Sequence, residues 1–320
     1  MKALIIEEYG SIEVLKFKDI PKPSPKNNEV LVKIKSTTVN RSDCGFRSGT
    51  PFVSKLFTGY PKPKKQILGS EFSGVIEECG NDVKNFKIGD EIFALSPNDL
   101  GSHAEYICID ANGFISKKAE NYSFDQAAAV LDGLMLANNY IRDIDFKTID
   151  NILINGATGS IGSACVQLAK YHGNIEITAV ANTKNIDLIK SIGADYVIDY
   201  LNEDFTKIDK KFDVVLDAVG KSSFQKCRAI LKEKGTYYSS ELGESNENIY
   251  LPLITKFRKQ KVKFPIPLDG KIDIEFYKKV IEEGKYKAII DKTYSFDDII
   301  EAYKYVETGE KTGNVVIKIS

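Results

Sequence analysis

The chain has 320 residues, and its 44 Lys and Arg against 45 Asp and Glu give a formal charge of −1. That length favours two domains, each large enough to bury its own core. The near-neutral charge excludes a strong long-range attraction to nucleic acid or to an anionic membrane, and no run reaches the ~20 apolar residues of a membrane-spanning helix. The odd number of dispersed cysteines, 5 in all, and an N-terminus unlike a signal peptide predict free thiols in the cytoplasm.

The first third of the chain predicts antiparallel β structure. Its segments alternate apolar and polar residues or carry β-branched runs, and turn-forming sequences such as PKPSPKNN and FRSGT separate them. The predicted strands are residues 2–9, 29–37, 73–80 and 104–110. A helix is predicted over residues 123–144, with Ser123 as its N-cap and Asp125 and Gln126 in its first turn.

From residue 151 onward, strands and helices alternate. Short apolar runs between amphipathic helices are typical of a parallel sheet that is covered on both faces. The predicted strands are 151–156, 176–181, 195–200, 211–220 and 236–242, and the predicted helices are 160–173, 185–193 and 222–235. The tail of the chain predicts a helix, a strand, a second helix and a last strand.

The sequence INGATGSIGSACVQLAK joins the first of these strands to the first of these helices. Glycines at that position let the backbone approach a pyrophosphate, which then lies at the helix N-terminus. Compared strictly with the G-x-G-x-x-G pattern, the loop reads A-x-G-x-x-G from Ala157, with alanine in place of the first glycine. The alternative interpretation is a tight turn that is needed only for packing. Because a strand precedes the loop and a helix follows it, we predict a dinucleotide site at Gly156, Ala157, Thr158, Gly159, Ser160, Ile161 and Gly162.

The end of the next strand bears on the choice of dinucleotide. An NAD site usually ends this strand with an acid that binds the ribose hydroxyls, whereas here EITAVA leads into Asn182, Thr183 and Lys184. Asn182 can hydrogen-bond a 2′-phosphate and Lys184 can pair with it, which favours NADPH. The alternative is that Asn182 only caps the next helix and that Lys184 is solvated.

Several motifs occur in the order found in one enzyme family: VNRSDCGFRSG, LGSEFSGVIEECG, FKIGDEIFA, GSHAEY, the glycine loop, SIGADYVIDY, FDVVLDAVG and TGNVVIKI. Through them nearly the whole chain resembles the medium-chain dehydrogenase/reductase superfamily, and within it the zinc-free quinone oxidoreductase branch. The resemblance implies an α/β protein with a GroES-like β-rich catalytic domain at residues 1–122 and 267–320. It also implies a Rossmann NADP-binding domain, a doubly wound parallel sheet, at residues 123–266. A homodimer through that domain is implied too, with its edge strand within residues 249–267.

The resemblance also bears on metal binding. Zinc-dependent relatives have a cysteine where this chain has Asn40 and a histidine where it has Ser70, which leaves Glu71 without partner ligands. Catalytic zinc needs three protein ligands drawn from Cys, His and carboxylate. The four cysteines that hold a structural zinc in those relatives have no counterpart after GDEIFA. We therefore predict no metal.

Without a metal, the acceptor must be easily reduced by hydride, as quinones and conjugated enones are. The resemblance places Asn40, Asp43 and Arg47 at the catalytic site. Asn40 would donate an N–H to the developing oxyanion, Asp43 would orient the loop and Arg47 would help to bind substrate. Alternatively, Asp43 and Arg47 pair only to hold the loop. Aromatic residues within 50–66 either stack on a flat acceptor or pack, and His103 is expected to make a local hydrogen bond rather than a substrate contact.

The resemblance implies further cofactor contacts at the ends of later strands and in the tail. These residues are Tyr200, Ala218, Val219, Gly220, Ser239, Ser240 and Asn314. One departure is Met135, which stands where many relatives carry a threonine near the nicotinamide.

We expect an NADPH-dependent, zinc-independent oxidoreductase that transfers hydride to a quinone. An enone or alkenal reductase, or a zinc-free alcohol dehydrogenase-like enzyme, is the alternative within the superfamily. A redox sensor that binds NADPH without turnover is the alternative outside enzymes.

Overall fold

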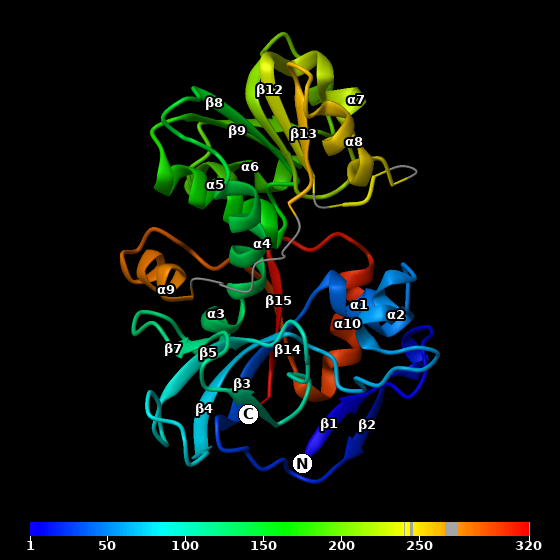
Figure 1. Ribbon diagram of the computed structural model, residues 1–320, viewed down its shortest axis with the longest axis vertical. Coiled ribbons are helices and arrows are strands. Elements are labelled where there is room, and N and C mark those ends of the chain that lie inside the picture. The colour runs from blue at the N-terminus through cyan, green and yellow to red at the C-terminus, as the bar shows by residue number, and fades with distance from the viewer. Residues whose placement is uncertain (240, 244–245, 266–273, 320) are drawn as a thin grey trace. The chain divides into compact units, whose positions relative to one another are not determined.

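The computed structural model of the protein describes residues 1–239, 241–243, 246–265 and 274–319. The chain divides into two compact units, and both chain ends belong to the same one (Figure 1). Unit 1 comprises Met1–Asp132, Ile272–Glu283 and Ala288–Ser320, and unit 2 comprises Gly133–Lys271 and Gly284–Lys287. The stretch from Ser123 to Asp132, which the resemblance assigns to the nucleotide domain, thus packs with unit 1. The second proposed boundary, at residues 266 and 267, lies outside the described residues.

Unit 1 is built on a mainly antiparallel sheet, as predicted for the first third of the chain. Its strand order is β14 (Ile290–Ser295), β15 (Asn314–Lys318), β3 (Glu29–Val39), β4 (Glu71–Cys79), β5 (Glu91–Leu95) and β7 (Ile115–Lys117), and β6 (Tyr106–Asp110) also pairs with β3. Only β14 and β15 run parallel. A small two-stranded sheet joins β1 (Lys2–Ile5) to β2 (Lys16–Asp19).

The alternation along β3 explains the core of this sheet. Val30, Val32 and Ile34 point to one face, where they pack in a single cluster with Phe72 of β4 and Ile92 of β5. Because successive side chains of a strand point to opposite faces, apolar residues at every second position form one continuous buried face.

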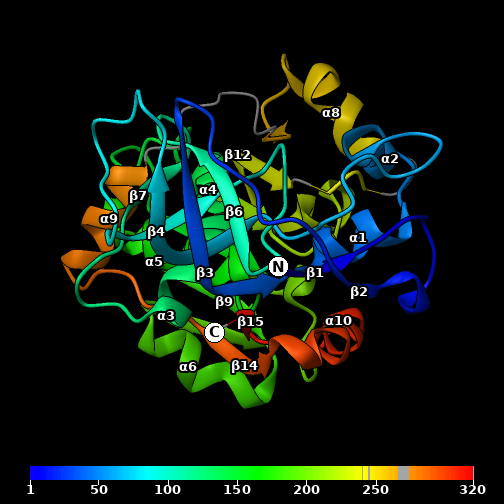
Figure 2. The same cartoon turned by 90° about the horizontal axis from the view of Figure 1, so that it is seen from below.

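The helices of unit 1 come from three separate parts of the chain. They are α1 (Arg41–Ser48), α2 (Val53–Thr58), α3 (Phe124–Ala128), α9 (Ile274–Glu282) and α10 (Ile299–Glu307), together with the short 3₁₀ turns η1 (Ile12–Val14) and η6 (Phe296–Asp298). Helix α10 lies beside β14 and β15 (Figure 2). The order predicted for the tail is therefore confirmed.

The helix predicted over residues 123–144 is interrupted. Ser123 caps α3 in a reciprocal capping box with Gln126, as predicted. The helix then stops at Ala129, and α4 (Leu131–Ile141) begins after a break. The chain passes from unit 1 to unit 2 shortly after this break, between Asp132 and Gly133 in the first turn of α4.

Unit 2 contains the predicted parallel sheet. Its strand order is β10 (Tyr196–Asp199), β9 (Glu176–Ala181), β8 (Asn151–Asn155), β11 (Phe212–Asp217), β12 (Leu231–Ser239) and β13 (Lys261–Lys263), and every pair is parallel. The connecting helices are α5 (Ser160–His172), α6 (Ile186–Ser191), α7 (Phe224–Cys227) and α8 (Glu247–Thr255), with 3₁₀ turns η2 (Thr183–Asn185), η3 (Phe205–Lys207) and η4 (Arg228–Ile230). The strand order reverses between β8 and β11, which is where α/β sheets of this kind bind their ligands.

One predicted helix, residues 222–235, is wrong over its second half. Helix α7 ends at Cys227, and from Leu231 the chain is already strand β12. LKEKG has good helix formers, but Leu231 pairs with Phe212 of β11 and is buried in the sheet's core. Long-range pairing has overridden local helix propensity here.

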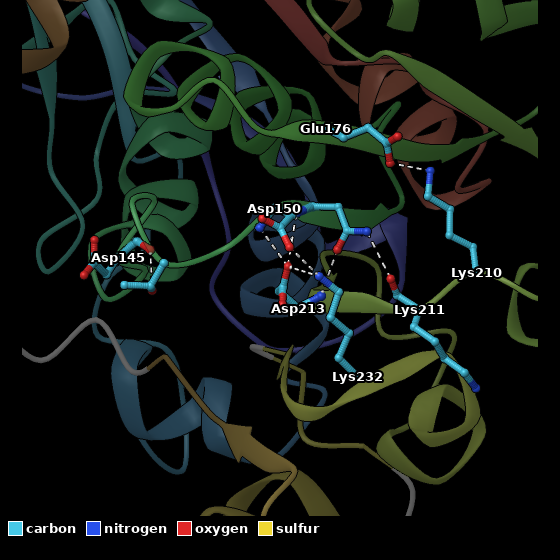
Figure 3. A network of polar contacts seen from close by, with 9 residues as sticks. Asp145, Asp150, Glu176, Lys210, Lys211, Asp213 and Lys232 are labelled. Atoms are coloured by element: carbon cyan, nitrogen blue, oxygen red, sulfur yellow. Dashed lines mark hydrogen bonds and ion pairs between the residues drawn. The ribbon is translucent and has the colours of Figure 1, made fainter.

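At the amino ends of the strands, polar contacts tie β8, β11 and β12 together (Figure 3). Asp213 accepts from the backbone N–H of Asp150 (2.8 Å), and Lys232 donates to both Asp213 (2.8 Å) and Asp150 (2.9 Å). The glycine loop leaves β8 at the opposite, carboxyl edge of the same sheet. Ion pairs therefore fix the edge remote from the predicted cofactor site.

Within the described ranges, no helix has both the length and the apolar character needed to span a bilayer. All five cysteines are free thiols, as predicted.

Candidate active site and cofactor site

The segment that carries Asn40 is fixed by a reciprocal cap. Asn40 is the N-cap of α1, and its side-chain Oδ1 accepts from the backbone N–H of Asp43 (3.0 Å). Asp43 Oδ2 in turn accepts from the backbone N–H of Asn40 (2.9 Å), and Asp43 Oδ1 accepts from the N–H of Gly69 (3.2 Å). One buried carboxyl group thus joins the start of α1 to the loop that leads into β4. Asp43 thus holds this loop in place, and its part in catalysis stays a prediction.

This cap leaves one group of Asn40 free. The residue is only 9% exposed, its Oδ1 is occupied, and its amide Nδ2 is buried with no hydrogen-bond partner in the described part of the chain. A buried donor without a partner is costly, so such groups are often reserved for a ligand. The geometry therefore offers one oriented N–H donor beside Asp43.

Arg47 does not pair with Asp43. Its guanidinium donates to the carbonyl of Gly10 (2.7 Å) and forms an ion pair with Glu307 of α10. Only 3% of the residue is exposed. These contacts hold α1 against α10, and a role for Arg47 in substrate binding stays a prediction.

A second buried carboxyl group, Glu71, lies at the start of β4. It is 1% exposed, and its oxygens accept from the Thr38 hydroxyl (2.7 Å) and from the backbone N–H of Asp132 (2.9 Å). Burial, and then the neighbouring charge of Asp132, raise the pKa of Glu71 above its ordinary value of 4.5. Burial likewise raises the pKa of Asp43, to about 7. Both groups therefore hold protons more tightly than exposed carboxyl groups do.

Lys311 supplies positive charge to this carboxyl cluster. Burial lowers the pKa of Lys311, while the charges of Asp132 and Glu71 oppose that change. Conversely, Lys311 opposes the rise that burial causes in the pKa of Asp132. Sequence reasoning missed Asp132 and Lys311, because they are far apart along the chain and neither belongs to a recognisable motif.

His103 is fully buried, and both ring nitrogens have partners. Nε2 lies 2.8 Å from the carbonyl oxygen of Thr38, and Nδ1 lies 3.1 Å from the hydroxyl of Tyr303. Burial lowers the pKa of His103 to about 4. The local hydrogen bond expected for this histidine is therefore found.

The residues present fit a zinc ion poorly. Within the described residues, no group of three or more His, Cys, Asp or Glu is arranged to hold a metal. Both oxygens of Glu71 already accept hydrogen bonds, and the neighbouring Asn40 and Ser70 side chains are not among the ligand types that zinc prefers.

In unit 2 the glycine loop has the shape that a pyrophosphate site needs. Gly156 has φ +79°, and a Cβ there would lie 2.7 Å from Cβ of Val219, so the loop touches the turn after β11. A Cβ at Gly162 would lie 2.1 Å from the carbonyl oxygen of Gly156. Helix α5 begins at Ser160, whose hydroxyl is buried without a partner in the described residues. Free N–H groups and a free hydroxyl at a helix N-terminus fit a phosphate.

The turn after β11 depends on one carboxyl group that sequence reasoning missed. Asp217 is fully buried, and its Oδ1 accepts from the Asn155 amide (3.0 Å) and the N–H of Gly220 (3.0 Å). Its Oδ2 accepts from the N–H of Ser222 (3.1 Å) and the hydroxyl of Tyr237 (3.0 Å). Asp217 thus fixes the turn to strands β8 and β12. The sequence signal that could have identified Asp217 was an acidic residue at the end of an apolar predicted strand.

The two residues predicted to read the 2′-phosphate follow β9 directly. Asn182 Oδ1 accepts from the Asn185 amide (2.7 Å), and Lys184 is exposed. The neighbouring strand brings an acid to this point, because Asp199 of β10 is the register partner of Ala181. Thr183 donates its hydroxyl hydrogen to Asp199 at 2.5 Å.

The other residues predicted to contact the cofactor do not all lie in one unit. Tyr200 is 52% exposed next to the end of β9, and Ser239 is buried at the end of β12. Asn314 belongs to unit 1, where its amide donates to the carbonyls of Ala129 (2.8 Å) and Ile289 (3.2 Å). Ser240 lies outside the described residues. Cofactor contacts by these residues stay predictions.

Glu71 gives a test of this buried cluster. Between pH 4.5 and about 8, folded Glu71 keeps a proton that the unfolded chain has released, so the free energy of unfolding falls as pH rises. Glu71→Gln mimics the protonated form, and Thr38 can reverse its hydroxyl to accept from the new amide. The variant should therefore lose less stability across this window, by up to ~1.4 kcal/mol per pH unit for a single proton.

Urea unfolding at half-unit steps of pH measures this slope. Glu78→Gln, on the exposed face of the same strand, is the matched control and should leave the slope unchanged. A slope for Glu71→Gln equal to that of the wild type would contradict the assignment.

The chain matches models of known protein families in both of its units. Residues 26–119 match the family model described as alcohol dehydrogenase GroES-like domain, and residues 192–317 match the one described as zinc-binding dehydrogenase. A solved quinone oxidoreductase from Coxiella burnetii superposes with a TM-score of 0.87 at 29% identity, covering 100% of this chain and 99% of that chain.

Several named relatives match nearly all of the sequence. A 2-methylene-furan-3-one reductase of Solanum lycopersicum is 33% identical, over 99% of this chain and 79% of that protein. A chloroplast envelope quinone oxidoreductase homolog of Arabidopsis thaliana is 29% identical, over 99% of this chain and 98% of that protein. With the fold and the glycine loop, these matches show that the chain belongs to the medium-chain dehydrogenase/reductase superfamily, in its quinone oxidoreductase branch, and is an NAD(P)H-dependent oxidoreductase.

Proposed function

We propose that the protein is a zinc-independent, NADPH-dependent oxidoreductase that transfers hydride from the nicotinamide to a quinone. Asn40 donates the hydrogen bond that stabilises the oxyanion formed on the acceptor. The observation that carries the proposal is the buried Nδ2 of Asn40, which has no partner in the described residues while its Oδ1 is held by Asp43. Such a donor is already oriented when charge develops in the transition state.

The chemistry of the donor set supports an easily reduced acceptor. An amide N–H gives less electrostatic stabilisation than a zinc ion would, so it suits acceptors whose reduced anion is already delocalised. Three exposed aromatic side chains on and beside α2 (Phe52, Phe57 and Tyr60) offer surfaces on which a flat ring can stack. Helix α2 packs against α1, the helix that Asn40 caps.

An enone or alkenal reductase is the second candidate. One relative is named 2-methylene-furan-3-one reductase, and another, 29% identical, is named NADPH-dependent alkenal/one oxidoreductase. Hydride addition to an enone also produces a delocalised anion on oxygen, so Asn40 would serve both reactions in the same way. Parallel assays with 1,4-benzoquinone and a short alkenal, with and without a chelator, decide between the two. Turnover of neither acceptor, or activity that a chelator abolishes, would overturn the proposal.

Asn40 can be tested apart from its capping role. Serine is a good N-cap, so Asn40→Ser keeps the bond from Asp43 N–H while it removes the amide donor. We expect kcat and kcat/KM to fall together by about 10²-fold, because the lost interaction acts mainly in the transition state. NADPH affinity, measured by fluorescence titration, should be unchanged, since the glycine loop belongs to unit 2.

Asn40→Ala is the companion variant for this test. It loses both the donor and the cap, so it should match Asn40→Ser in rate but unfold more easily, by ~0.5–2 kcal/mol. Wild-type rates in Asn40→Ser would show that Asn40 is only a helix cap.

The preference for NADPH is proposed from Asn182 and Lys184. A lysine that pairs with a phosphate strengthens binding by about tenfold, so Lys184→Ala should weaken NADPH by that factor and leave NADH nearly unchanged. Lys190→Ala removes an equally exposed lysine farther from the end of β9 and should alter neither affinity. Equal losses for both cofactors in Lys184→Ala would show that Lys184 does not contact the 2′-phosphate.

We also propose a homodimer formed through unit 2, in the cytoplasm, where the five free thiols stay reduced. Strand β13 ends the described sheet, so its outer edge is available for pairing. The neighbouring α8 segment exposes five large apolar side chains, Ile249, Tyr250, Leu253, Ile254 and Phe257, and Leu253 is 76% exposed. A second copy of the chain would cover this surface.

Sedimentation velocity tests the homodimer. The wild type should sediment as twice 35.7 kDa, and Leu253→Asp should shift it to the monomer because a buried charge without a partner is costly. Leu56→Asp, at a 68% exposed position on α2 in unit 1, should leave the dimer intact. A monomeric wild type would refute the interface.

A further inference from the structure

We propose that Asp199 is a specificity-determining residue, whose carboxylate at the end of β10 repels the 2′-phosphate of NADPH and so limits the preference for NADPH over NADH. The proposal rests on the proposed cofactor site, in which the adenosine ribose lies at the end of β9. In this proposal, the Asp199 charge opposes the effect of Asn182 and Lys184, the two residues that favour the phosphate.

The parallel pairing of two strands places Asp199 beside this site. Asp199 is the register partner of Ala181, the residue directly before Asn182. The next residue, Tyr200, donates its backbone N–H to the carbonyl of Ala181 at 3.0 Å. The ends of β9 and β10 are therefore held side by side, and the acid missing from the tip of β9 is supplied by its neighbour.

Hydrogen bonds fix the Asp199 carboxylate against the 182–184 turn. Oδ2 accepts from the Thr183 hydroxyl (2.5 Å) and from the Asn202 amide (2.7 Å), and Oδ1 accepts from the N–H of Leu201 (3.1 Å). Because its hydrogen is given to Asp199, the Thr183 hydroxyl is not free to donate to a phosphate. The same bonds, led by that of Thr183, lower the pKa of Asp199, so the group is ionised at neutral pH.

The charge of Asp199 is not neutralised locally. Among the ion pairs of the described residues, none includes Asp199, and Lys184 makes none either. A phosphate monoester carries between one and two negative charges at pH 7, and like charges at a surface repel with an energy that depends on distance and salt. NADH has only hydroxyl groups at this point, so it does not experience the repulsion.

Asp199→Asn tests the inference in the full-length protein. The asparagine keeps the size of the side chain and an acceptor for Leu201. Its amide can donate to Thr183 and Asn202 when the Thr183 hydroxyl reverses and the exposed Asn202 amide turns its oxygen toward it. We expect the dissociation constant for NADPH, from titration of nucleotide fluorescence at low salt, to fall by about threefold to tenfold. The constant for NADH should stay within about twofold.

Two controls separate charge from structure. Asp195→Asn removes a carboxylate just before the start of the same strand, where it accepts from the N–H of Ile177 (2.8 Å) and pairs with Lys170. It should leave the ratio of the two affinities unchanged. Repeating the Asp199→Asn titration at high salt should shrink the gain for NADPH, because the Debye length falls from about 10 Å at 0.1 M to about 3 Å at 1 M, so exposed charges are screened more strongly.

Each outcome is decisive. An unchanged NADPH affinity, or an equal change for both cofactors, would overturn the inference and make Asp199 a structural part of the turn. A gain that persists at high salt would also overturn it, since a charge effect at this exposed position must be screened. If the wild type binds neither cofactor, the proposed function itself fails, and this inference fails with it.

Discussion

A carboxyl group that is buried must have its oxygens hydrogen-bonded, because an unpaired charge or polar atom away from water is costly. Asp43 and Asp217 meet this requirement by accepting backbone N–H groups from the loops around them. Each therefore fixes the conformation of its own loop. In unit 1 the result is a positioned Asn40 amide, and in unit 2 it is a positioned turn against the glycine loop.

The second buried cluster follows the same rule with a different result. Glu71 accepts from Thr38 and from the N–H of Asp132, and Lys311 supplies positive charge nearby. The Glu71 carboxyl group is thereby committed to internal hydrogen bonds. Burial shifts the protonation equilibrium of this cluster, so we expect the stability of unit 1 to depend on pH.

The cofactor edge of unit 2 shows how a parallel sheet combines residues from separate loops. The ends of neighbouring strands lie side by side, so the turn after β9 is influenced by the last residue of β10. In our proposal, Asn182 and Lys184 favour a phosphate there and Asp199 disfavours it. Cofactor choice at this edge would then be a balance of three side chains rather than the property of one strand end.

The sequence by itself determined the features that depend on local pattern. Period-two alternation predicts the antiparallel strands of unit 1, and buried runs between amphipathic helices predict the parallel sheet of unit 2. The glycine loop between β8 and α5, the Ser123 cap and the order of elements in the tail follow from short-range rules of the same kind. These hold because backbone conformation and capping are set within a few residues.

Only the tertiary structure decided the contacts between distant parts of the chain. Leu231 became strand instead of helix because Phe212 pairs with it. Asp132 and Lys311 are far from Glu71 along the chain, and only the folded unit brings them near enough to bond it or to act on its charge. Asp199 faces the turn at Asn182 because two parallel strands share a register. The charge and burial of such groups depend on neighbours that no local pattern specifies, and for that reason the roles of Asp132 and Lys311 beside Glu71 were not predictable from the sequence.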